Sequence, residues 1–355
     1  MARTTLKDIA QAAGCSITTV SHALNRTRYV AAGTRATIEK LAADMGYHPD
    51  PVARLLQGQN SCVIGHILSA LHDNPFFALV ARGADRRAHE LGYSTILSYT
   101  DRQPEAEERA VRLLLEKRVD GIIFTTPISA ANVELCVASG VATVMIERPW
   151  PVHGAHAVIV DHHSGVRDLT RLLIDQGHQD LAYIGGDYSL AGSAFVEQQR
   201  LRGFHDAIEE ASLAVIPSRT FLIPYASDAA RTACRSLLDA GPRPDALVIG
   251  SDLLAADVLQ VLYERGVRIP DDLSIVSVDN TLGPYMAPAL TEVEPPAEDM
   301  GGRAVELIVR QCQDQDARTH THSRQRGRRI ILEPQLRLRA STRAIPAPAV
   351  SIVAS

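Results

Sequence analysis

The stretch TLKDIAQAAGCSITTVSHALN, residues Thr5–Asn25, holds two short helical segments on either side of one glycine. Apolar residues recur at helical spacing over 6–13, and the threonine that opens the stretch is a candidate N-cap for them. Gly14 allows the left-handed backbone of a tight turn, and Ser16 can cap a second helix over 17–24. Two helices joined in this way predict a helix-turn-helix, which places its second helix in a DNA major groove.

Two further helices are expected before residue 60. Residues 35–45 predict a third helix, with Thr34 as its cap and Gly46 at its end. Residues 50–58 (DPVARLLQG) predict a short fourth helix with proline in its first turn. A helix of this length is unstable alone in water, so this hinge segment requires a partner.

The charge is divided unevenly along the 355 residues, whose net charge is −5. Residues 1–60 contain seven Lys/Arg and four Asp/Glu, a net charge of +3, which leaves −8 on the remainder. A basic end on an acidic body suits a protein that contacts phosphates at one place. The five dispersed cysteines contain no C-x-x-C pair, and neither a signal peptide nor an apolar run of about 18 residues is present. We therefore expect a cytoplasmic protein without a disulfide framework, metal site, membrane span or cofactor.

From residue 61 the pattern changes to short apolar strands that alternate with amphipathic helices, which predicts parallel sheets covered on both faces. Two runs of similar design, beginning near Gly65 and Gly185, predict two doubly wound sub-domains. Ligands of such sheets bind beyond the carboxyl ends of the strands, so the cleft between the sub-domains is the expected ligand site. Strands are expected at 63–68, 94–98, 121–124, 142–146, 158–160, 181–184, 220–223, 246–249 and 274–278.

The N-terminal stretch closely resembles the headpiece of the lac-repressor family of bacterial regulators, which reads K-D-V/I-A-x-x-A-G-V-S-x-x-T-V-S-x-x-L-N. The run TTVSH looks most like the purine- and ribose-repressor subgroup. The body resembles that of the same family and of the periplasmic sugar-binding proteins in NPFF (74–77), KRVDGII (117–123), GHQDLAYIGG (177–186) and GVRIPDDLSIVSVDN (266–280). The resemblance covers nearly the whole chain. It implies an α-helical helix-turn-helix headpiece and an α/β periplasmic-binding-protein-like body of two doubly wound parallel-sheet sub-domains.

The resemblance also implies a division of the chain. Residues 1–49 would form the DNA-binding domain, 50–60 the hinge helix, 61–343 the effector-binding and dimerisation domain, and 344–355 a flexible tail. Within the body, residues 61–162 and 292–325 would form the first sub-domain, and residues 163–291 and 326–343 the second.

By the family pattern, the second helix presents Ile17, Thr18 and His22 to base edges, where a hydroxyl, a methyl and an imidazole can read sequence. In the hinge, Ala53 lies where the two hinge helices of a dimer touch, and Leu56 is the wedge that opens the central base step. The residues expected to contact phosphates, and so to fix register, are Ser16, Thr19, Ser21, Asn25 and Thr34.

The effector site can be carried over in the same way. Aromatic residues after the first strand would stack on a sugar ring, and carboxylates and arginines at other strand ends would bond its hydroxyls. Ser251 stands where sugar binders often have asparagine, and Pro295 where many members have a ligand-binding glutamine. The paired Arg148 and Arg200 also allow an anionic ligand. The expected effector-binding residues are Ser69, Asn74, Phe76, Phe77, Glu147, Arg148, Arg200, Ser251 and Asp279.

These residues predict a transcriptional regulator, a repressor, that binds a pseudo-palindromic operator as a homodimer and responds to a sugar or sugar derivative. An enzyme is the main rival class, but G-x-G-x-x-G, G-x-S-x-G and the P-loop are missing from the sequence. We interpret His162-His163 beside Asp161 as a strand-end loop and not a metal cluster. A free sugar-binding protein is a second rival class, but it would need an export signal, which we do not find. A nucleobase or anionic effector and a regulator without ligand response stay open, as do ligand-induced release and ligand-promoted binding of DNA.

Overall fold

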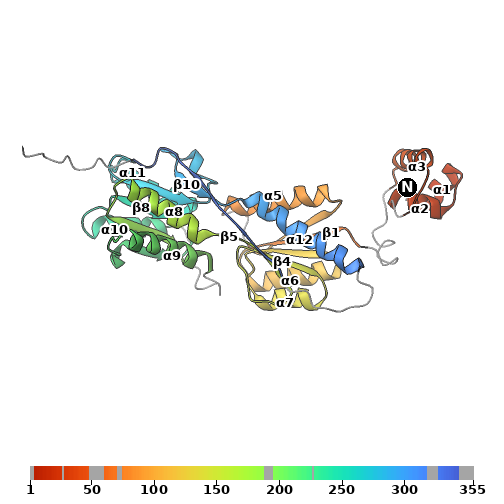
Figure 1. Cartoon of the computed structure of the whole chain (residues 1–355), viewed down its shortest axis with the longest axis horizontal. Helices are drawn as coiled ribbons and strands as arrows, with labels where there is room; N and C mark the ends of the chain where they lie inside the picture. The colour runs from red at the N-terminus through yellow and green to blue at the C-terminus, as the bar shows by residue number, and fades with distance from the viewer. Residues whose placement is uncertain are drawn as a thin grey trace, which may run out of the picture. The chain divides into compact units, whose positions relative to one another are not determined.

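The computed structural model describes residues 4–25, 28–47, 60–69, 74–187, 195–225, 228–317 and 327–343. The chain forms two compact units, Met1–Ser61 and Cys62–Ser355 (Figure 1). The predicted hinge helix over 50–58 and the tail over 344–355 lie outside the described residues. Within the described ranges, no helix combines the length and apolar character needed to cross a bilayer.

The described part of the first unit contains three helices, α1 (Leu6–Ala13), α2 (Ile17–Asn25) and α3 (Ala32–Asp44). Their apolar faces meet in a small core in which Ile9, Val20 and Ile38 are fully buried. The sequence predicted the first two helices almost to the residue, because helical periodicity and capping residues agree there.

The predicted caps of the first two helices are confirmed. Thr5 and Asp8 form a reciprocal capping box at the start of α1, with the Thr5 amide donating to Asp8 at 2.8 Å. The Thr19 amide donates to Ser16 Oγ at 3.0 Å at the start of α2. Gly14, with φ of 62°, makes the turn between the two helices.

The predicted start of the third helix is wrong. Helix α3 begins at Ala32, and its N-cap Ala31 makes no side-chain capping bond. Thr34 therefore lies inside the first turn as an exposed residue. The helix starts three residues earlier than predicted, at Ala32 instead of residue 35, and includes Gly33, although glycine disfavours a helix interior and no side chain caps this end.

The second unit contains two six-stranded sheets. The first has the order β11-β5-β4-β3-β1-β2, and all its pairings are parallel. The second has the order β12-β10-β9-β8-β6-β7 and is parallel except for the pair β10–β12. The first-sheet strands are β1 (Val63–Leu68), β2 (Ser94–Tyr99), β3 (Gly121–Thr125), β4 (Ala142–Ile146), β5 (His156–Val160) and β11 (Arg329–Leu332). Those of the second are β6 (Leu181–Gly186), β7 (Thr220–Ile223), β8 (Ala246–Ile249), β9 (Ser274–Val278), β10 (Thr291–Glu294) and β12 (Gln335–Arg337).

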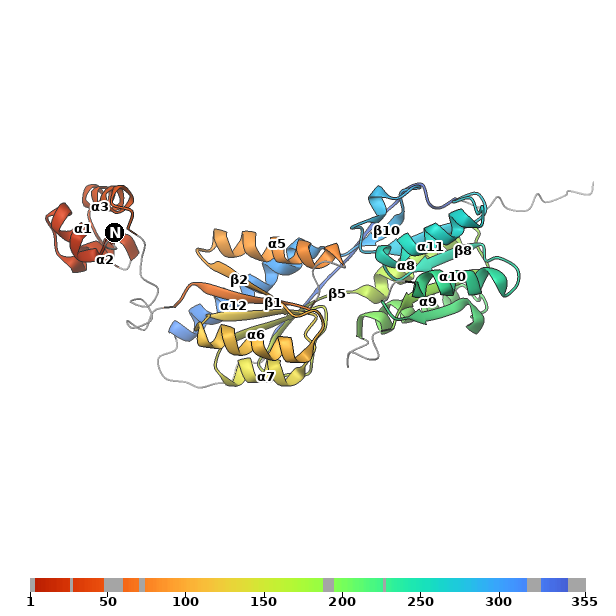
Figure 2. The ribbon, with the colours of Figure 1, turned by 180° about the vertical axis from the view of Figure 1, so that it is seen from behind.

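Helices cover both faces of each sheet, as strand-helix alternation predicts. In the first sub-domain, α5 and α12 lie on one face and α6 and α7 on the other (Figures 1 and 2). In the second, α8 and α9 cover one face and α10 and α11 the other. The helices are α5 (Pro75–Glu90), α6 (Pro104–Glu116), α7 (Ala130–Ala138), α8 (His162–Asp175), α9 (Phe195–Glu210), α10 (Ala229–Asp239), α11 (Asp252–Glu264) and α12 (Ala297–Ala317), with 3₁₀ turns at Pro217–Arg219 and Gly283–Tyr285.

The described chain passes between the two sub-domains three times, after β5, after β10 and between β11 and β12. Two of these crossings differ from the predicted boundaries. Strand β10 belongs to the second sheet, although residues from 292 onward were expected in the first sub-domain. Strand β11 belongs to the first sheet, although residues 326–343 were expected in the second, because β11 pairs in parallel with β5 from Arg329 to Leu332.

Candidate functional site

A cavity of about 560 Å³ lies at the carboxyl ends of strands from both sheets. Residues that follow β1, β3 and β4 line one side, and residues that follow β6, β7 and β9, together with α9, line the other. This is the location that the doubly wound topology predicts, because the carboxyl ends of parallel strands meet at one edge of each sheet.

The structure brings eight of the nine expected effector-binding residues together around this cavity. Ser251 is the exception, since it does not line the cavity. It caps α11, where its Oγ accepts from the Leu253 amide at 3.3 Å, and it donates to Asp279 Oδ2 at 2.8 Å. The eight that line the cavity are Ser69, Asn74, Phe76, Phe77, Glu147, Arg148, Arg200 and Asp279.

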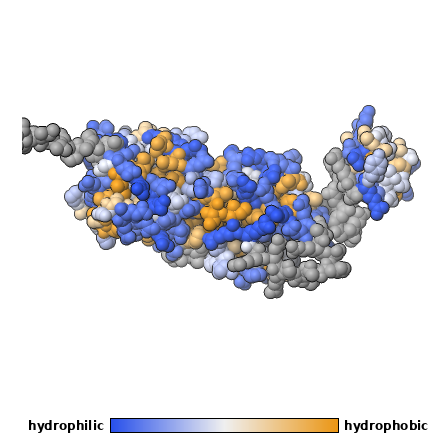
Figure 3. All heavy atoms as spheres, in the orientation of Figure 1, coloured by the Kyte–Doolittle hydropathy of each residue, from blue (hydrophilic) through white to orange (hydrophobic). Residues whose placement is uncertain are grey.

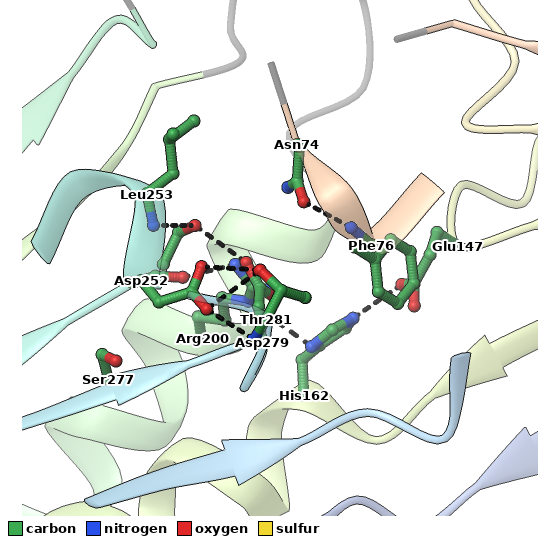
Figure 4. A network of polar contacts seen from close by, with 12 residues as sticks. Asn74, Phe76, Glu147, His162, Arg200, Asp252, Leu253, Ser277, Asp279 and Thr281 are labelled. Carbon is green, nitrogen blue, oxygen red and sulfur yellow. Dashed lines mark hydrogen bonds and ion pairs between the residues drawn. The ribbon is translucent and has the colours of Figure 1, made fainter. Parts of the chain in front are cut away.

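Arg200, on α9, is the centre of a buried polar network (Figure 4). Its Nη2 donates to Asp279 Oδ1 at 3.1 Å, its Nη1 donates to the carbonyl of Gly250, and Nη1 also lies 3.6 Å from Glu197 Oε1. Burial by itself would lower the pKa of the Arg200 guanidinium. The negative charges of Asp279 and Glu197 raise this pKa by more than burial lowers it, so the net pKa is raised. The positive charge of Arg200 is thus compensated inside the protein.

Glu147 contributes a second buried carboxylate, at the end of β4 in the first sub-domain. Its Oε2 lies 2.6 Å from Nε2 of His162, the first residue of α8. The Nδ1 of the same ring accepts from Arg200 Nε at 3.4 Å. A single imidazole therefore connects a carboxylate of the first sub-domain to the guanidinium of the second.

The loop that carries Asp279 is fixed by another acidic residue, Asp252, in the first turn of α11. The Asp252 carboxylate accepts from the amides of Thr281 and Leu282, each at 2.6 Å. Burial and the neighbouring Asp279 raise the pKa of Asp252 to about 6. Burial likewise raises the pKa of Glu292, on β10, to about 8. Burial therefore favours the neutral forms of these acids behind the cavity.

The aromatic side of the cavity is built by the start of α5. Asn74 caps this helix by accepting from the Phe76 amide at 2.9 Å, and it also lines the cavity. Phe76 and Phe77 follow, with their rings edge to face at 5.8 Å between centroids. Tyr225 adds an aromatic ring from the second sub-domain, and its hydroxyl donates to Glu197 at 3.1 Å. The cavity therefore combines aromatic rings with carboxylates and arginines.

Several residues of the cavity or its network were not predicted. His162 was interpreted as part of a strand-end loop, but the structure buries it in the first turn of α8, capped by Asp161. Its position directly after a predicted strand was the available signal. Glu197 lies three residues before Arg200 and therefore on the same face of the helix. This spacing could have predicted that Glu197 belongs to the same network as Arg200. Tyr225 and Asp252 gave no signal beyond their location near strand ends.

The expected DNA-contacting residues can be placed only in part. Ile17 and Thr18 are exposed at the start of α2, with 47% of Ile17 accessible, whereas Ser21 and His22 are half-buried. Ser16 is exposed, and Thr19 is half-buried beside it. The side chain of Asn25, and the hinge residues Ala53 and Leu56, lie outside the described residues.

Two family models match the chain. Bacterial regulatory proteins of the lacI family match residues 5–50, and the periplasmic binding protein-like domain matches residues 170–342. Together they cover the headpiece and most of the second sub-domain.

Characterised relatives align along almost the whole chain. The transcriptional regulator DegA of Bacillus subtilis (strain 168) is 32% identical over 345 residues, which are 96% of this chain and 98% of DegA. The ribose operon repressor of Halalkalibacterium halodurans is 32% identical over 321 residues, 90% of this chain and 93% of that protein. Among solved structures, the lac repressor dimer bound to operator and the anti-inducer ONPF has a TM-score of 0.77 at 25% identity, covering 97% of this chain and 100% of that one. These relatives are transcriptional regulators, not enzymes.

Proposed function

The chain belongs to the lacI family of bacterial regulatory proteins, and on that premise we propose that it is a transcriptional repressor controlled by a sugar-like effector. It binds a pseudo-palindromic operator as a homodimer, and the effector occupies the cavity between its two sub-domains. Occupancy of the cavity changes the angle between the sub-domains and with it the affinity for operator.

The headpiece supports the DNA-binding half of this proposal. Helix α2 is anchored by buried Val20 and Ala23, while Ile17 and Thr18 are exposed at its amino-terminal end. The amino-terminal residues of a recognition helix are those that reach base edges in the major groove. The net charge of +3 on residues 1–60 favours contact with phosphates in the same part of the chain.

Exposed apolar side chains support the homodimer. Strand β2 is an edge strand of the first sheet and exposes Leu97 and Tyr99, and Leu113 of α6 is also exposed. The edge strand β7 of the second sheet exposes Leu222. Figure 3 shows further hydrophobic side chains gathered on the surface of the α/β unit. Edge strands with apolar residues are normally covered, and a second copy would cover them.

The composition of the cavity carries the proposal of a polyol effector. Aromatic rings suit the apolar face of a sugar, and carboxylates accept hydrogen bonds from its hydroxyls. An anionic effector would need an excess of cations, but the described lining carries four acidic residues against three arginines, Arg102, Arg148 and Arg200. Arg200 is in addition already engaged by Asp279 and Glu197. This balance favours a neutral polyol over a sugar phosphate or a sugar acid.

A thermal-shift screen tests the effector assignment. Pentoses, hexoses, sugar phosphates and purines are added to the protein with and without operator DNA. A ligand that binds only the folded state raises the melting temperature by mass action. We expect at least one neutral sugar to do so and to change operator affinity. A response to purines or sugar phosphates alone would replace the polyol assignment.

Operator selection tests the DNA-binding assignment. From a pool of random duplexes, the protein should enrich a near-palindrome with half-sites about one helical turn apart. If the protein retained all duplexes equally at physiological salt, it would not be a sequence-specific repressor.

A further inference from the structure

His162 occupies an unusual place in the α/β unit. It is the first residue of α8, directly after the first passage of the chain from one sub-domain to the other. Its side chain is only 3% exposed, and each ring nitrogen has a partner. One partner is a carboxylate, which accepts hydrogen bonds, and the other is a guanidinium, which donates them. One partner, Glu147, lies at the end of β4 in the first sheet, and the other, Arg200, lies on α9 of the second sub-domain.

The two partners determine where the imidazole proton lies. Arg200 Nε can only donate, so Nδ1 of His162 must accept and carries no proton. Nε2 then carries the proton and donates it to Glu147 Oε2 at 2.6 Å. The ring is therefore the neutral Nε2–H tautomer, with one donor and one acceptor in fixed directions.

The chain of contacts continues on both sides of the imidazole. Arg200 is in turn bound to Asp279, which lines the cavity from the second sub-domain. Glu147 lines the cavity from the first sub-domain, and its Oε1 has no hydrogen-bond partner within the described residues. The series Glu147–His162–Arg200–Asp279, here called the relay, thus joins one carboxylate that faces the cavity from the first sub-domain to one that faces it from the second (Figure 4).

We propose that His162 is a positioning residue that couples effector occupancy to the angle between the sub-domains through the relay. The imidazole donates to Glu147 of the first sub-domain and accepts from Arg200 of the second. Rotation of one sub-domain relative to the other therefore breaks one of these two bonds. An effector that bonds Glu147 and Asp279 favours the angle at which both bonds of His162 exist. This inference rests on the proposed function, since it requires an effector in this cavity.

The neighbouring histidine provides a matched control. His163 pairs with Asp206 at 2.7 Å, and its side chain is 25% exposed. It does not line the cavity and has no bond to Glu147 or Arg200 among the described contacts. A variant at His163 changes the same residue type on the same helix without touching the relay.

Three variants of His162 test its bonds to Glu147 and to Arg200 together and one at a time. His162→Phe retains a ring but removes both bonds. His162→Asn retains an acceptor near the place of Nδ1, and His162→Gln retains a donor near the place of Nε2. Each protein is checked for native secondary structure and cooperative melting before use, and if the phenylalanine variant does not fold, the asparagine and glutamine variants decide the outcome.

The measured quantity is the ratio of operator dissociation constants with and without a probe. The probe is the aldose from the thermal-shift panel that raises the melting temperature of the unmodified protein most. We expect a ratio in the range of about 5–150 for the unmodified protein and for His163→Phe. His162→Phe should bring the ratio below about twofold while leaving probe-free operator binding within about threefold, and the amide variants should give intermediate ratios.

The outcomes distinguish the relay from the proposed function. If no aldose shifts the melting temperature of the unmodified protein, the proposed effector class fails. If the unmodified protein responds and His162→Phe responds equally, the relay is overturned and the proposed function stands.

Nuclear magnetic resonance tests the relay without any effector. In protein labelled with ¹⁵N-histidine, the ring signals that disappear in His162→Phe belong to His162. At neutral pH they should show one protonated nitrogen, Nε2, and one unprotonated nitrogen, Nδ1. A proton on Nδ1, alone or together with Nε2, would overturn the relay, because Arg200 could not then donate to the ring.

Discussion

Glu147 and Asp279 line the cavity from different sheets, and both have a left-handed backbone, with φ of 68° and 100°. Neither is glycine, so each conformation costs about 1–3 kcal/mol and must be enforced by its surroundings. The Glu147 amide donates to Val158 O and the Asp279 amide donates to Val293 O, each at 3.0 Å. These bonds hold both residues at the turn that follows a strand. Strain of this kind is concentrated at functional sites, which agrees with an effector site at this cavity.

Replacing Asp279 by alanine should abolish the response to an effector while operator binding without effector persists. The change removes a cavity carboxylate and leaves Arg200 with one partner fewer, so we also expect a loss of stability of about 3 kcal/mol. Thermal shift with the aldose panel, gel retardation on operator and denaturant unfolding measure the three effects. Asp279→Asn is the control for stability, because its amide oxygen can still accept from Arg200. A normal effector response in Asp279→Ala would remove Asp279 from the site.

Much of the fold could be predicted because local signals agree with the final structure. Strands such as 63–68 and 142–146 are buried and largely apolar, and glycines such as Gly92 and Gly177 follow the ends of helices with positive φ. The strands β10, β11 and β12 could not be predicted. They have three or four residues, β12 is exposed, and β10 reads TEVE. Their pairing depends on partners far away in sequence, and this also explains why the predicted sub-domain boundaries were displaced.

The site was predictable where a residue follows a strand and its chemistry suggests a ligand. The carboxyl ends of parallel strands meet at one edge of each sheet, so Ser69 and Glu147 could be expected at the ligand edge of the first sheet and Asp279 at that of the second. His162 could not be assigned in this way, because its role depends on partners from another strand end and from α9. A histidine beside a second histidine and an aspartate looks equally like a polar loop, and only the packing of α8 against α9 shows that it is buried.

Thr18→Ala should weaken specific operator binding by about tenfold, in the range of 1–3 kcal/mol for a lost base-edge contact. Thr18 is exposed at the start of α2, so the substitution should leave the headpiece folded. Thr37→Ala is the matched control, because Thr37 is also exposed but lies on α3, where its hydroxyl donates to Gly33 O. Fluorescence anisotropy on operator and on a scrambled duplex provides the measurement. Equal effects of both substitutions would move the recognition surface away from α2.

His66 should make the protein less stable as the pH falls below neutral. Its ring lies fully buried on β1, where Nε2 pairs with Thr125 and Nδ1 has no partner within the described residues. Burial lowers the pKa of His66 from 6.5 to about 4. Between these values the unfolded chain binds a proton that the folded protein does not, so the free energy of unfolding decreases as the pH falls. The full effect is on the order of 3 kcal/mol.

Denaturant unfolding near neutral pH and near pH 4.5 measures this effect as a difference between proteins. His66→Leu should lose less stability on acidification than the unmodified protein, by about 2–3 kcal/mol. His89, exposed on α5, serves as control, and His89→Leu should behave like the unmodified protein. If His66→Leu and His89→Leu showed the same pH dependence, the buried imidazole would not be the acid-sensitive group.

Two adjacent glycines of α12 should respond in opposite ways to alanine. Helices α5 and α12 pack so closely that a Cβ on Gly301 would lie 2.1 Å from Val80 O and 2.6 Å from the Ala84 amide nitrogen. Backbone atoms cannot yield as a side chain can, so Gly301→Ala must separate the helices and should destabilise the protein by at least about 2 kcal/mol. A Cβ on Gly302 would meet nothing closer than Arg87 Cβ at 3.8 Å.

Gly302→Ala should therefore be neutral or stabilising by up to about 1 kcal/mol, because alanine has the higher helix propensity. Chemical denaturation of the two variants beside the unmodified protein gives both values in one experiment. The pair isolates the backbone approach from helix propensity, since both substitutions add the same methyl group to the same helix. Equal stability of the two variants would show that α5 and α12 are not in backbone contact at Gly301.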